Sequence, residues 1–547
     1  MTKRQTTTIS ILVIIIFALG FLASRRFWFR LDLTKNKAYT ISAVSRNLYA
    51  EIPEQMRITY YVSDKLKAIH PMPGEIEDLL REYAAYSRGK IQVTVRDPMK
   101  AKVTEAIENM GIQAQQIQTA EQGEASIITV YTGIVIDYLD QIEVLPVVFS
   151  LSTLEYDLTS RIRSLARGRT RQAGIIAADN PRNFADEYRY LYNSLAQAAY
   201  RVRLIMPGDD ISDELPLLIV LGGVETLDDA ALYQIDRYIQ TGGRVLFTVK
   251  AVGIDKEESI EAHLLEDNGL LAMLSLYGVT IQPEIAMDRS ALTMQYDTRL
   301  PNGGIQRRIT RNMQWIRVLP ENGNRDHPVS ANFNGLDLYW PNPMIIQSPE
   351  SLEIVPLFAS TPDAWSMREP FNTNPDLYYL LERDAAQSKG VKIFGVSLSG
   401  EFPSWFRDKP KPDSAVADEL RDMPETPKPA RVIVVSETDF VTSFINATGA
   451  SRNLDFLLQA ADWLGNDDDI IGIRNRVSGT GELDLILDPA RKASVIRSTQ
   501  IINTIVMPVL VILAGVLIAL RRRAKSRVLA VQDENNNVTV KEQSDEI

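Results

Sequence analysis

The chain contains no cysteine, and its three histidines, His70, His263 and His327, lie far apart in a sequence of 547 residues. The absence of cysteine excludes disulfides, thiolate metal sites, a cysteine nucleophile and a lipid-modified N-terminal cysteine. Three dispersed histidines cannot form a metal site from sequence neighbours. The residues therefore predict no metal site and no cofactor.

Motifs for nucleotide and for ester hydrolysis are also missing. No Gly-x-x-x-x-Gly-Lys-Ser/Thr sequence occurs, so the chain is not a P-loop ATPase on its own. Gly395 to Ser399 read GVSLS and lack the final glycine of a Gly-x-Ser-x-Gly elbow. The formal net charge of −11 argues against nucleic acid as a partner. We expect a protein that is not an enzyme.

Two long apolar segments bracket the chain. Residues 6–24 and 501–520 carry no charge, and each is long enough to cross a bilayer as a helix. The alternative for the first segment is a cleaved signal peptide. Cleavage requires a small residue at the −3 position, where Phe21 or Leu22 would stand, so we favour an uncleaved anchor.

Basic residues predict how these segments are oriented. Five of them follow the second segment directly, at positions 521–523, 525 and 527, which places the C-terminus in the cytoplasm. With two spans, residues 1–5 are cytoplasmic as well, although Arg25, Arg26 and Arg30 alone would favour the opposite orientation. We expect a bacterial inner-membrane protein with an extracytoplasmic, periplasmic body. The tail 521–547 is first basic and then polar, and we expect it to be disordered.

The first part of the body, residues 25–150, reads as a small α+β domain. Strands are predicted at 56–63, 90–98, 125–132 and 134–147, with a helix at 74–87, in an order like that of thioredoxin. Without a Cys-x-x-Cys motif, redox chemistry is excluded. Thr40 or Ser42 can cap the first helix. Ser152 and Glu155 have the spacing of a capping box, which starts a linker helix over 151–170.

The second part, residues 171–465, alternates strands and helices. Apolar runs such as QAGIIAAD (172–179) are typical of buried parallel strands, so we predict an open, doubly wound, flavodoxin-like α/β domain. An α+β segment over about 255–385 is inserted into it. Residues 407–428 are rich in proline and charge and predict a mobile loop. Residues 466–500 lead back to the membrane.

Three polar residues follow strands of this domain: Asp179, Asn180 and Asp439. Ligands of doubly wound sheets bind beyond the carboxyl ends of the strands, so these residues are candidates for lining a ligand crevice. The alternative is that they cap the following helices. Trp340, with Trp365, Trp405 and Phe406, is a candidate for stacking on a sugar or a partner. The alternative is packing under long loops.

Several stretches, in order along nearly the whole chain, resemble one family. They are RLDLTKNKAYTIS (30–42), LEYDLTSRIRSLARG (154–168), NGLLAMLSLYGVTIQPEIAMD (268–288), HPVSANF (327–333), VPLFASTPDAW (355–365), GEFPSWF (400–406), ARVIVVSETDFV (430–441) and NLDFLLQAADWL (453–464). The set is similar to the GldG-like auxiliary components of ABC transporters, named from bacterial gliding motility. The central portion of that family is also similar to a domain of intraflagellar transport proteins and to class I glutamine amidotransferases.

The resemblance implies a function and partners. It implies a non-catalytic membrane subunit whose permease and ATPase are separate chains, and whose extracytoplasmic body couples them to an envelope substrate or partner. Amidotransferase activity does not carry over, because it needs the cysteine that this chain lacks. The alternative reading is a membrane-anchored module that binds a glycan or another envelope ligand. Motility itself does not follow from the resemblance.

Overall fold

The computed structural model describes residues 40–465, together with 473, 497–498, 509 and 515; the gaps within the first range are 122–123, 150, 169–170, 180–182, 256–259, 300–302, 332, 375–376, 378–380, 382–387 and 414–419. The chain divides into two compact units, Met1–Gly479 and Thr480–Ile547, and every strand and helix below belongs to the first. The predicted span 6–24 lies outside the described residues, as does 501–520 except for residues 509 and 515. Within the described part of the chain, no helix combines the length and apolar character needed to cross a membrane.

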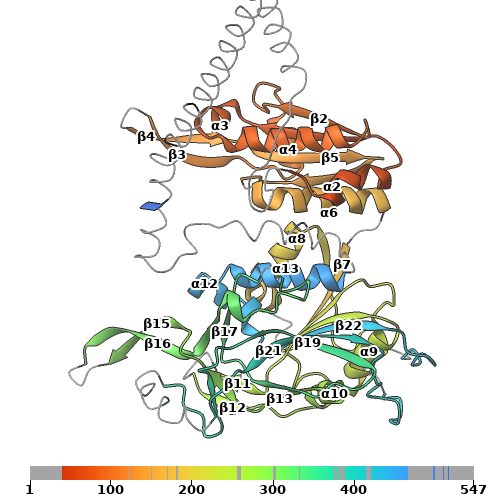
Figure 1. Cartoon of the computed structure of the whole chain (residues 1–547), viewed down its shortest axis with the longest axis vertical. Helices are drawn as coiled ribbons and strands as arrows, with labels where there is room; N and C mark the ends of the chain where they lie inside the picture. Colours follow the sequence, from red (N-terminus) through yellow and green to blue (C-terminus); the bar gives the residue numbers. More distant parts are fainter. Residues whose placement is uncertain are drawn as a thin grey trace, which may run out of the picture. The chain divides into compact units, whose positions relative to one another are not determined.

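A four-stranded sheet organises the N-terminal part (Figure 1). Its order is β2 (Ile91–Arg96), β1 (Met56–Val62), β5 (Thr132–Tyr138) and β6 (Gln141–Leu145). β1 and β2 are parallel and joined through α4 (Met72–Tyr86), whereas the other pairings are antiparallel. This is an α+β arrangement, and its likeness to thioredoxin stays a prediction. The smaller elements are α2 (Ala43–Asn47), η1 (Leu48–Glu51), α3 (Asp64–Ile69), α5 (Thr104–Asn109) and the hairpin β3 (Gln115–Glu121)–β4 (Glu124–Val130).

Helix α6 (Leu151–Arg167) contributes to two hydrophobic cores. Leu158 and Ile162 pack in the core of the N-terminal sheet, whereas Tyr156 belongs to a core of the following α/β domain. α6 lies in the range predicted for the linker helix. It therefore packs on both parts of the chain that it connects.

The first helix is capped as the sequence predicts, whereas α6 begins one residue before its predicted cap, Ser152. Ser42 is the N-cap of α2, and its hydroxyl accepts a hydrogen bond of 3.0 Å from the Ser45 amide. α6 already begins at Leu151, so Ser152 lies inside the helix. The Glu155 carboxylate instead accepts from the Ser42 amide at 2.5 Å and from Ser45 Oγ at 2.7 Å. Glu155 thus joins α6 to the start of α2, 113 positions earlier in the chain.

The second part is built on a nine-stranded sheet. Five parallel strands lie in the order β8 (Tyr200–Leu204), β7 (Arg171–Ala177), β9 (Leu218–Leu221), β10 (Arg244–Thr248) and β22 (Ala430–Val435). In chain order this is 2-1-3-4-5, the flavodoxin-like order of doubly wound sheets. The central strand β9 is wholly apolar and buried because both faces of the sheet are covered, whereas the edge strand β8 carries Arg201 and Arg203 and is mostly exposed.

Helices cover both faces of this sheet (Figure 1). α8 (Arg189–Gln197) and α13 (Arg452–Leu464) pack in the core that contains Ile175 of β7. α9 (Asp229–Gln240) and α10 (Leu270–Leu276) pack in the core that contains the neighbouring residue, Ile176. Successive side chains of a strand point to opposite faces, which explains the two separate cores. The predicted α/β class is thus confirmed, with helices on both faces of the sheet.

Part of the predicted insertion joins the main sheet. Three of its strands extend the main sheet through β21 (Ile393–Gly400), which runs antiparallel to β22: β13 (Val279–Ile281), β18 (Met344–Ile346) and β19 (Leu352–Ala359). The sheet is therefore mixed rather than wholly parallel. Two of these strands have three residues each, too few to show a periodic pattern in the sequence.

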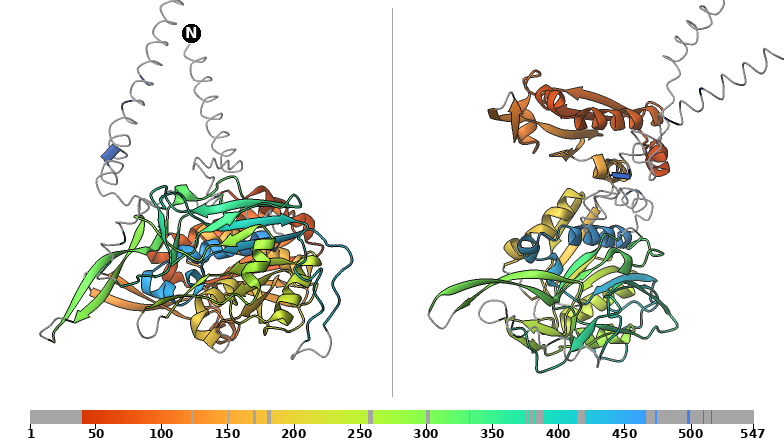
Figure 2. Two further views of the ribbon diagram at one scale, coloured as in Figure 1. Left: turned by 90° about the horizontal axis from the view of Figure 1, so that it is seen from below. Right: turned by 60° about the vertical axis from the view of Figure 1, so that its left-hand side comes forward.

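Smaller sheets complete this region. A three-stranded sheet contains a long hairpin, β15 (Ala291–Arg299) and β16 (Ile305–Val318), which extends away from the main sheet (Figures 1 and 2). The other elements are β17 (Leu336–Tyr339), the pair β11 (Val252–Ile254)–β12 (Ala262–Leu264), the pair β14 (Ile285–Met287)–β20 (Trp365–Met367), α7 (Phe184–Glu187), η3 (Pro320–Asn322), η6 (Asp439–Val441) and α12 (Phe444–Thr448). In 407–428, the described residues form no helix or strand.

Candidate functional site

The order of the parallel strands places a candidate site between β7 and β9. The chain leaves β7 toward β8 on one side and returns to β9 on the other, so the connections diverge between β7 and β9. At such a switch point the loops leave a crevice beyond the carboxyl ends of the strands, where ligands of doubly wound sheets bind. β7 is followed by Asp179, and β9 by Gly222 and Gly223.

The Asp179 carboxylate rests directly on the two glycines. Its Oδ1 accepts a hydrogen bond of 2.7 Å from the Gly223 amide. Gly222 has a φ of +72°, and a Cβ at this position would lie 1.9 Å from Asp179 Oδ2. Glycine is therefore required here both by the backbone conformation and by the approach of the carboxylate. Asp179 is itself an exposed residue.

Strands β10 and β22 bring a lysine and two more acids to the same edge. Lys250 follows β10, and its Nζ lies 3.9 Å from Asp439 Oδ2. Asp439 and Glu437 follow β22 and are 4% and 1% exposed. Glu437 accepts hydrogen bonds from the amides of Asp439 and Phe440, so it fixes the turn into η6. The Lys250 ammonium, on a side chain that is 16% exposed, thus lies among carboxylates that follow two strands, β7 and β22.

Burial and charge set the protonation of this cluster. Burial alone would lower the pKa of Lys250, but the carboxylates of Asp439 and Asp179 outweigh it and raise that pKa above its usual range. Partial desolvation raises the pKa of the Asp179 carboxyl, although the Gly223 amide and the charge of Lys250 oppose the shift. Desolvation also raises the pKa of the nearby Tyr188, and Asp179 and Asp439 add to the shift. Lys250 therefore stays an ammonium and is not available as an amine nucleophile.

The accessible carboxylate of the cluster is suited to accepting hydrogen bonds. Its accessible carboxylate, Asp179, can accept from hydroxyl or amine groups of a ligand. Among the residues that the structure describes, no group of three or more histidine, aspartate or glutamate side chains is placed to hold a metal ion.

Two of the four candidates named from the sequence come together here. Asp179 and Asp439, 260 positions apart, both lie close to Lys250. Asn180 lies outside the described residues. Lys250 and Glu437 were missed, although each follows a strand of the same sheet, as Asp179 does. The rule that selected Asp179 would also have selected them, had their strands been recognised as neighbours.

Trp340 lies in a different cluster. Its side chain is 3% exposed, packs edge-to-face on Trp315, and donates a hydrogen bond of 3.1 Å to Gln314 Oε1. Trp365 is wholly buried and donates to the Leu381 carbonyl. The rings of Trp340 and Trp365 therefore present no open face on which a sugar could stack. Trp405 is half-buried, with Lys409 Nζ 3.2 Å from its ring centroid.

A serine and a histidine meet elsewhere, near the incomplete GVSLS elbow. Ser397 Oγ lies 3.1 Å from His327 Nε2. His327 Nδ1 accepts a hydrogen bond from the Val329 amide, which places the ring proton on Nε2. Nε2–H then donates to Ser397 and cannot take its proton. The pair is therefore not arranged as a nucleophile and its general base.

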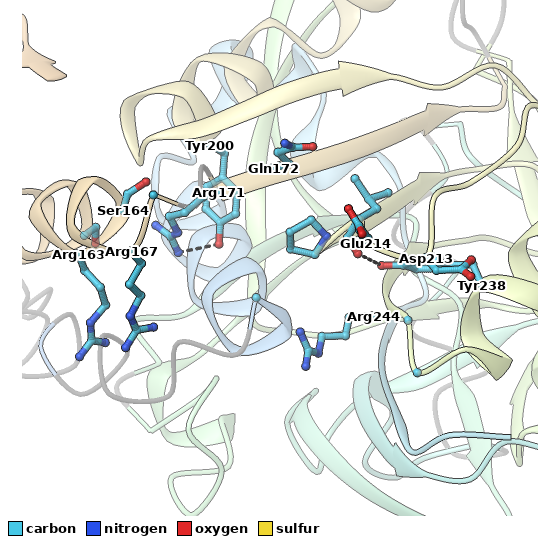
Figure 3. Close-up of a pocket in the computed structure, with 17 residues that line it drawn as sticks. Arg163, Ser164, Arg167, Arg171, Gln172, Tyr200, Asp213, Glu214, Tyr238 and Arg244 are labelled. Atoms are coloured by element: carbon cyan, nitrogen blue, oxygen red, sulfur yellow. Dashed lines mark hydrogen bonds between the residues drawn. The ribbon is translucent and has the colours of Figure 1, made fainter. Parts of the chain in front are cut away.

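A cavity of about 830 Å³ lies at the opposite, amino edge of the sheet (Figure 3). Arg163 and Arg167 project into it from α6, and Arg171 is directed at Tyr200. Arg163 and Arg167 both bind Glu51, at 3.0 and 2.9 Å, and Arg171 binds Asp462. These arginines already have carboxylate partners, so we assign their role to packing α6 against its neighbours.

The residues from β7 to the end of α13 match a known family. The matching family, described as an ABC-type uncharacterized transport system, covers residues 170–468, which is more than half of the chain. The chain belongs to this family. The family region contains the whole switch-point cluster. Residues 35–137 match a second family, described as Domain of unknown function (DUF7088).

One relative of this member of the transport-system family matches over nearly the whole chain, and its name gives no activity. An uncharacterized protein of Borreliella burgdorferi is 23% identical over 508 residues, covering 90% of this chain and 94% of the relative. The mmIFT52 N-terminal domain matches with a TM-score of 0.30 and 12% identity, covering 54% of this chain and 96% of that domain. Exo-beta-1,4-mannosidase Op5Man5 from Opitutaceae bacterium strain TAV5 matches with a TM-score of 0.22 and 10% identity, over 72% and 49%. Neither structural likeness supports a conclusion about fold or activity.

Proposed function

We propose that the protein is a non-catalytic auxiliary membrane subunit of an ABC transporter, in which its body couples the permease and ATPase to an envelope substrate or partner. The family match over residues 170–468 carries this proposal. The protonation of Lys250 and the tautomer of His327 support the non-catalytic part, because neither provides an activated nucleophile. The ATPase must be a separate chain, since this sequence has no P-loop.

The proposal includes a topology and a narrower kinship. Both termini would lie in the cytoplasm, with residues 6–24 and 501–520 as spans and the body on the periplasmic side of a bacterial inner membrane. The subunit would act as a GldG-like component, whether or not its transporter serves gliding motility. The two apolar segments and the basic residues after position 520 support this topology.

Co-purification tests the proposed function. The tagged full chain is extracted from its native membrane in a mild detergent, and its companions are identified by mass spectrometry. We expect an ABC ATPase and a polytopic permease in fixed ratio to this chain. Recovery of the chain alone, in several mild detergents and after crosslinking, would contradict the proposal.

The topology has its own test, because the native chain has no thiol. We introduce single cysteines by Ser63→Cys and, separately, Ser526→Cys. Cells with a permeabilised outer membrane and an intact inner membrane are then treated with a maleimide that cannot cross the inner membrane. Since Ser63 is 1% exposed, Arg57→Cys on the exposed part of β1 serves as a second reporter of the body. Labelling at position 57 without labelling at 526 is the expected result, and the reverse would invert the topology.

A second candidate function is ligand binding at the switch point. The position of Asp179, held by the Gly223 amide at the sheet edge where doubly wound sheets bind ligands, favours it. The ligand would be an envelope glycan or another molecule that offers hydroxyl or amine donors. We expect glycan fragments to raise the melting temperature of the full chain and Asp179→Ala to abolish the rise. An unchanged rise in the variant would place binding elsewhere.

A further inference from the structure

The hairpin of β15 and β16 has a base that packs on the body and an outer part that does not. At the base, Leu292, Met294, Met313 and Trp315 are each at most 8% exposed and belong to one hydrophobic core. Beyond them, residues 305–309 of β16 are all exposed. The outer part extends away from the main sheet in each view (Figures 1 and 2). Packing against the described residues of this chain therefore does not account for the side chains of the outer part.

One face of this outer part carries two isoleucines. Ile305 is 69% exposed and Ile309 is 67% exposed, and these are the highest values for large hydrophobic residues in the described part of the chain. Alternate residues of a strand share a face, so Arg307 and Arg311 lie on the same face as both isoleucines. We call Ile305, Arg307, Ile309 and Arg311 the hairpin face.

The partner strand makes this face mixed rather than continuously apolar. In the register of the hairpin, Gln295 lies opposite Ile309 and Asp297 opposite Arg307, with 3.2 Å between Arg307 Nε and Asp297 Oδ1. A bilayer favours an uninterrupted apolar face with aromatic residues at its border. Apolar side chains among arginines and polar groups are instead typical of protein interfaces.

The charge of the hairpin is opposite to that of the body. Residues 291–311 contain four arginines and one aspartate, whereas the whole chain has a net charge of −11. The terminal segments 1–39 and 521–547 are basic on balance, so the acidic excess lies in the body itself. A basic hairpin and an acidic body on the same chain are complementary between two copies. A pair of such contacts closes into a symmetric dimer.

We propose that the hairpin face is an interaction surface for a second copy of this chain, docking on the acidic body of that copy. Burying Ile305 and Ile309 would supply the hydrophobic part of the contact. Arg311 would pair with a carboxylate of the other copy and fix the orientation of the contact, while Arg307 keeps its ion pair with Asp297. The proposal is independent of the proposed transporter function, because it concerns only contacts between copies of one chain.

A crosslink from the hairpin face tests the contact directly. Ile309→Cys introduces the sole thiol of the full chain, which is then coupled to a maleimide–benzophenone reagent and irradiated in detergent and in native membranes. Isotopically light and heavy chains are mixed beforehand, so that contacts between copies are distinguished from contacts within one copy. We expect mixed light–heavy dimers with the reagent attached to acidic stretches of the body. Gln306→Cys, exposed on the opposite face, is the matched control and should give less than about a tenth of the product.

Self-association provides the second readout. We expect the full chain to be dimeric by light scattering and to dissociate as salt rises from about 0.1 to 1 M, because surface charge pairs are screened. Ile309→Glu with Arg311→Glu should weaken association at least about tenfold, whereas Gln306→Glu should not, and both should keep the wild-type circular dichroism. A monomer at every salt concentration, or crosslinks only to lipid or to other proteins, would overturn the proposal.

Discussion

The phenol of Tyr156 donates a hydrogen bond of 2.7 Å to Asp462 Oδ1, although 306 positions separate the two residues. The same oxygen accepts from Arg171 and from Tyr200. These residues come from α6, α13, β7 and the start of β8, and the side chain of Asp462 is wholly buried. A single carboxylate therefore joins the connecting helix to the first two strands and the last helix of the α/β domain.

Removing this carboxylate should destabilise the α/β domain. Asp462→Ala leaves Arg171, whose side chain is 9% exposed, without its counter-ion, and we expect a loss of about 3–5 kcal/mol in the free energy of unfolding. Tyr156→Phe removes one donor of three and should cost only about 1 kcal/mol. Urea unfolding of the full chain measures both. Equal losses would show that the hydrogen bond of Tyr156, rather than the ion pair, carries the stability.

Replacing Lys250 should make stability depend on pH. Lys250→Met leaves Asp179 and Asp439 without a cation, which should cost about 3 kcal/mol at pH 8. The pKa of Asp179 is already raised in the folded protein, so its charged form is disfavoured there. In the variant, the free energy of unfolding should fall as pH rises above the unfolded carboxyl pKa of about 4. The two carboxyls then lose their protons, and their negative charges repel each other without a cation between them.

The matching measurement is the difference in melting temperature between wild type and Lys250→Met from pH 4.5 to 8. We expect this difference to grow with pH. Adding Asp439→Asn to the variant should flatten the pH dependence, because one of the two charges is then gone. A difference of constant size would mean that Lys250 acts through packing alone.

Two glycine substitutions separate backbone strain from collision. In Gly449→Ala, the added Cβ has no atom within 4 Å, and the φ at this position is +69°. The substitution should therefore lower the free energy of unfolding only by the strain of a left-handed residue, about 1–2 kcal/mol. Gly222→Ala has nearly the same φ, +72°, but its Cβ would collide with the Asp179 carboxylate. We expect Gly222→Ala to lower the free energy of unfolding by about 1–3 kcal/mol more than Gly449→Ala, because the Gly223–Asp179 hydrogen bond is lost. Equal melting temperatures for the two variants would mean that Asp179 moves aside freely.

The Ser397–His327 pair should be chemically silent. Because Nε2–H donates to Ser397, a fluorophosphonate probe should not label the native chain above the level of Ser397→Ala. His327→Ala should leave labelling unchanged. Labelling that disappears in both variants would contradict the non-catalytic reading.

Local patterns predicted the elements but not how they meet. The apolar runs of β7, β9, β10 and β22 were visible because strands buried on both faces exclude polar residues. The direction of β21 was not visible, since an apolar run reads the same in a parallel and an antiparallel strand. The short strands β13 and β18 were missed because three residues show no periodicity. They pair with each other and with β21, so this part of the predicted insertion belongs to the main sheet.

The sequence by itself determined that the chain has no thiol chemistry and no P-loop, that two apolar segments bracket it, and that strands and helices alternate after residue 171. These properties depend on residue identity and on short-range periodicity. Only the tertiary structure decided that Asp179 meets Gly223, that Lys250 stands among carboxylates and that Trp340 is covered. Each of these contacts depends on the order of strands in the sheet, which brings together residues far apart in the chain and leaves no local mark in the sequence.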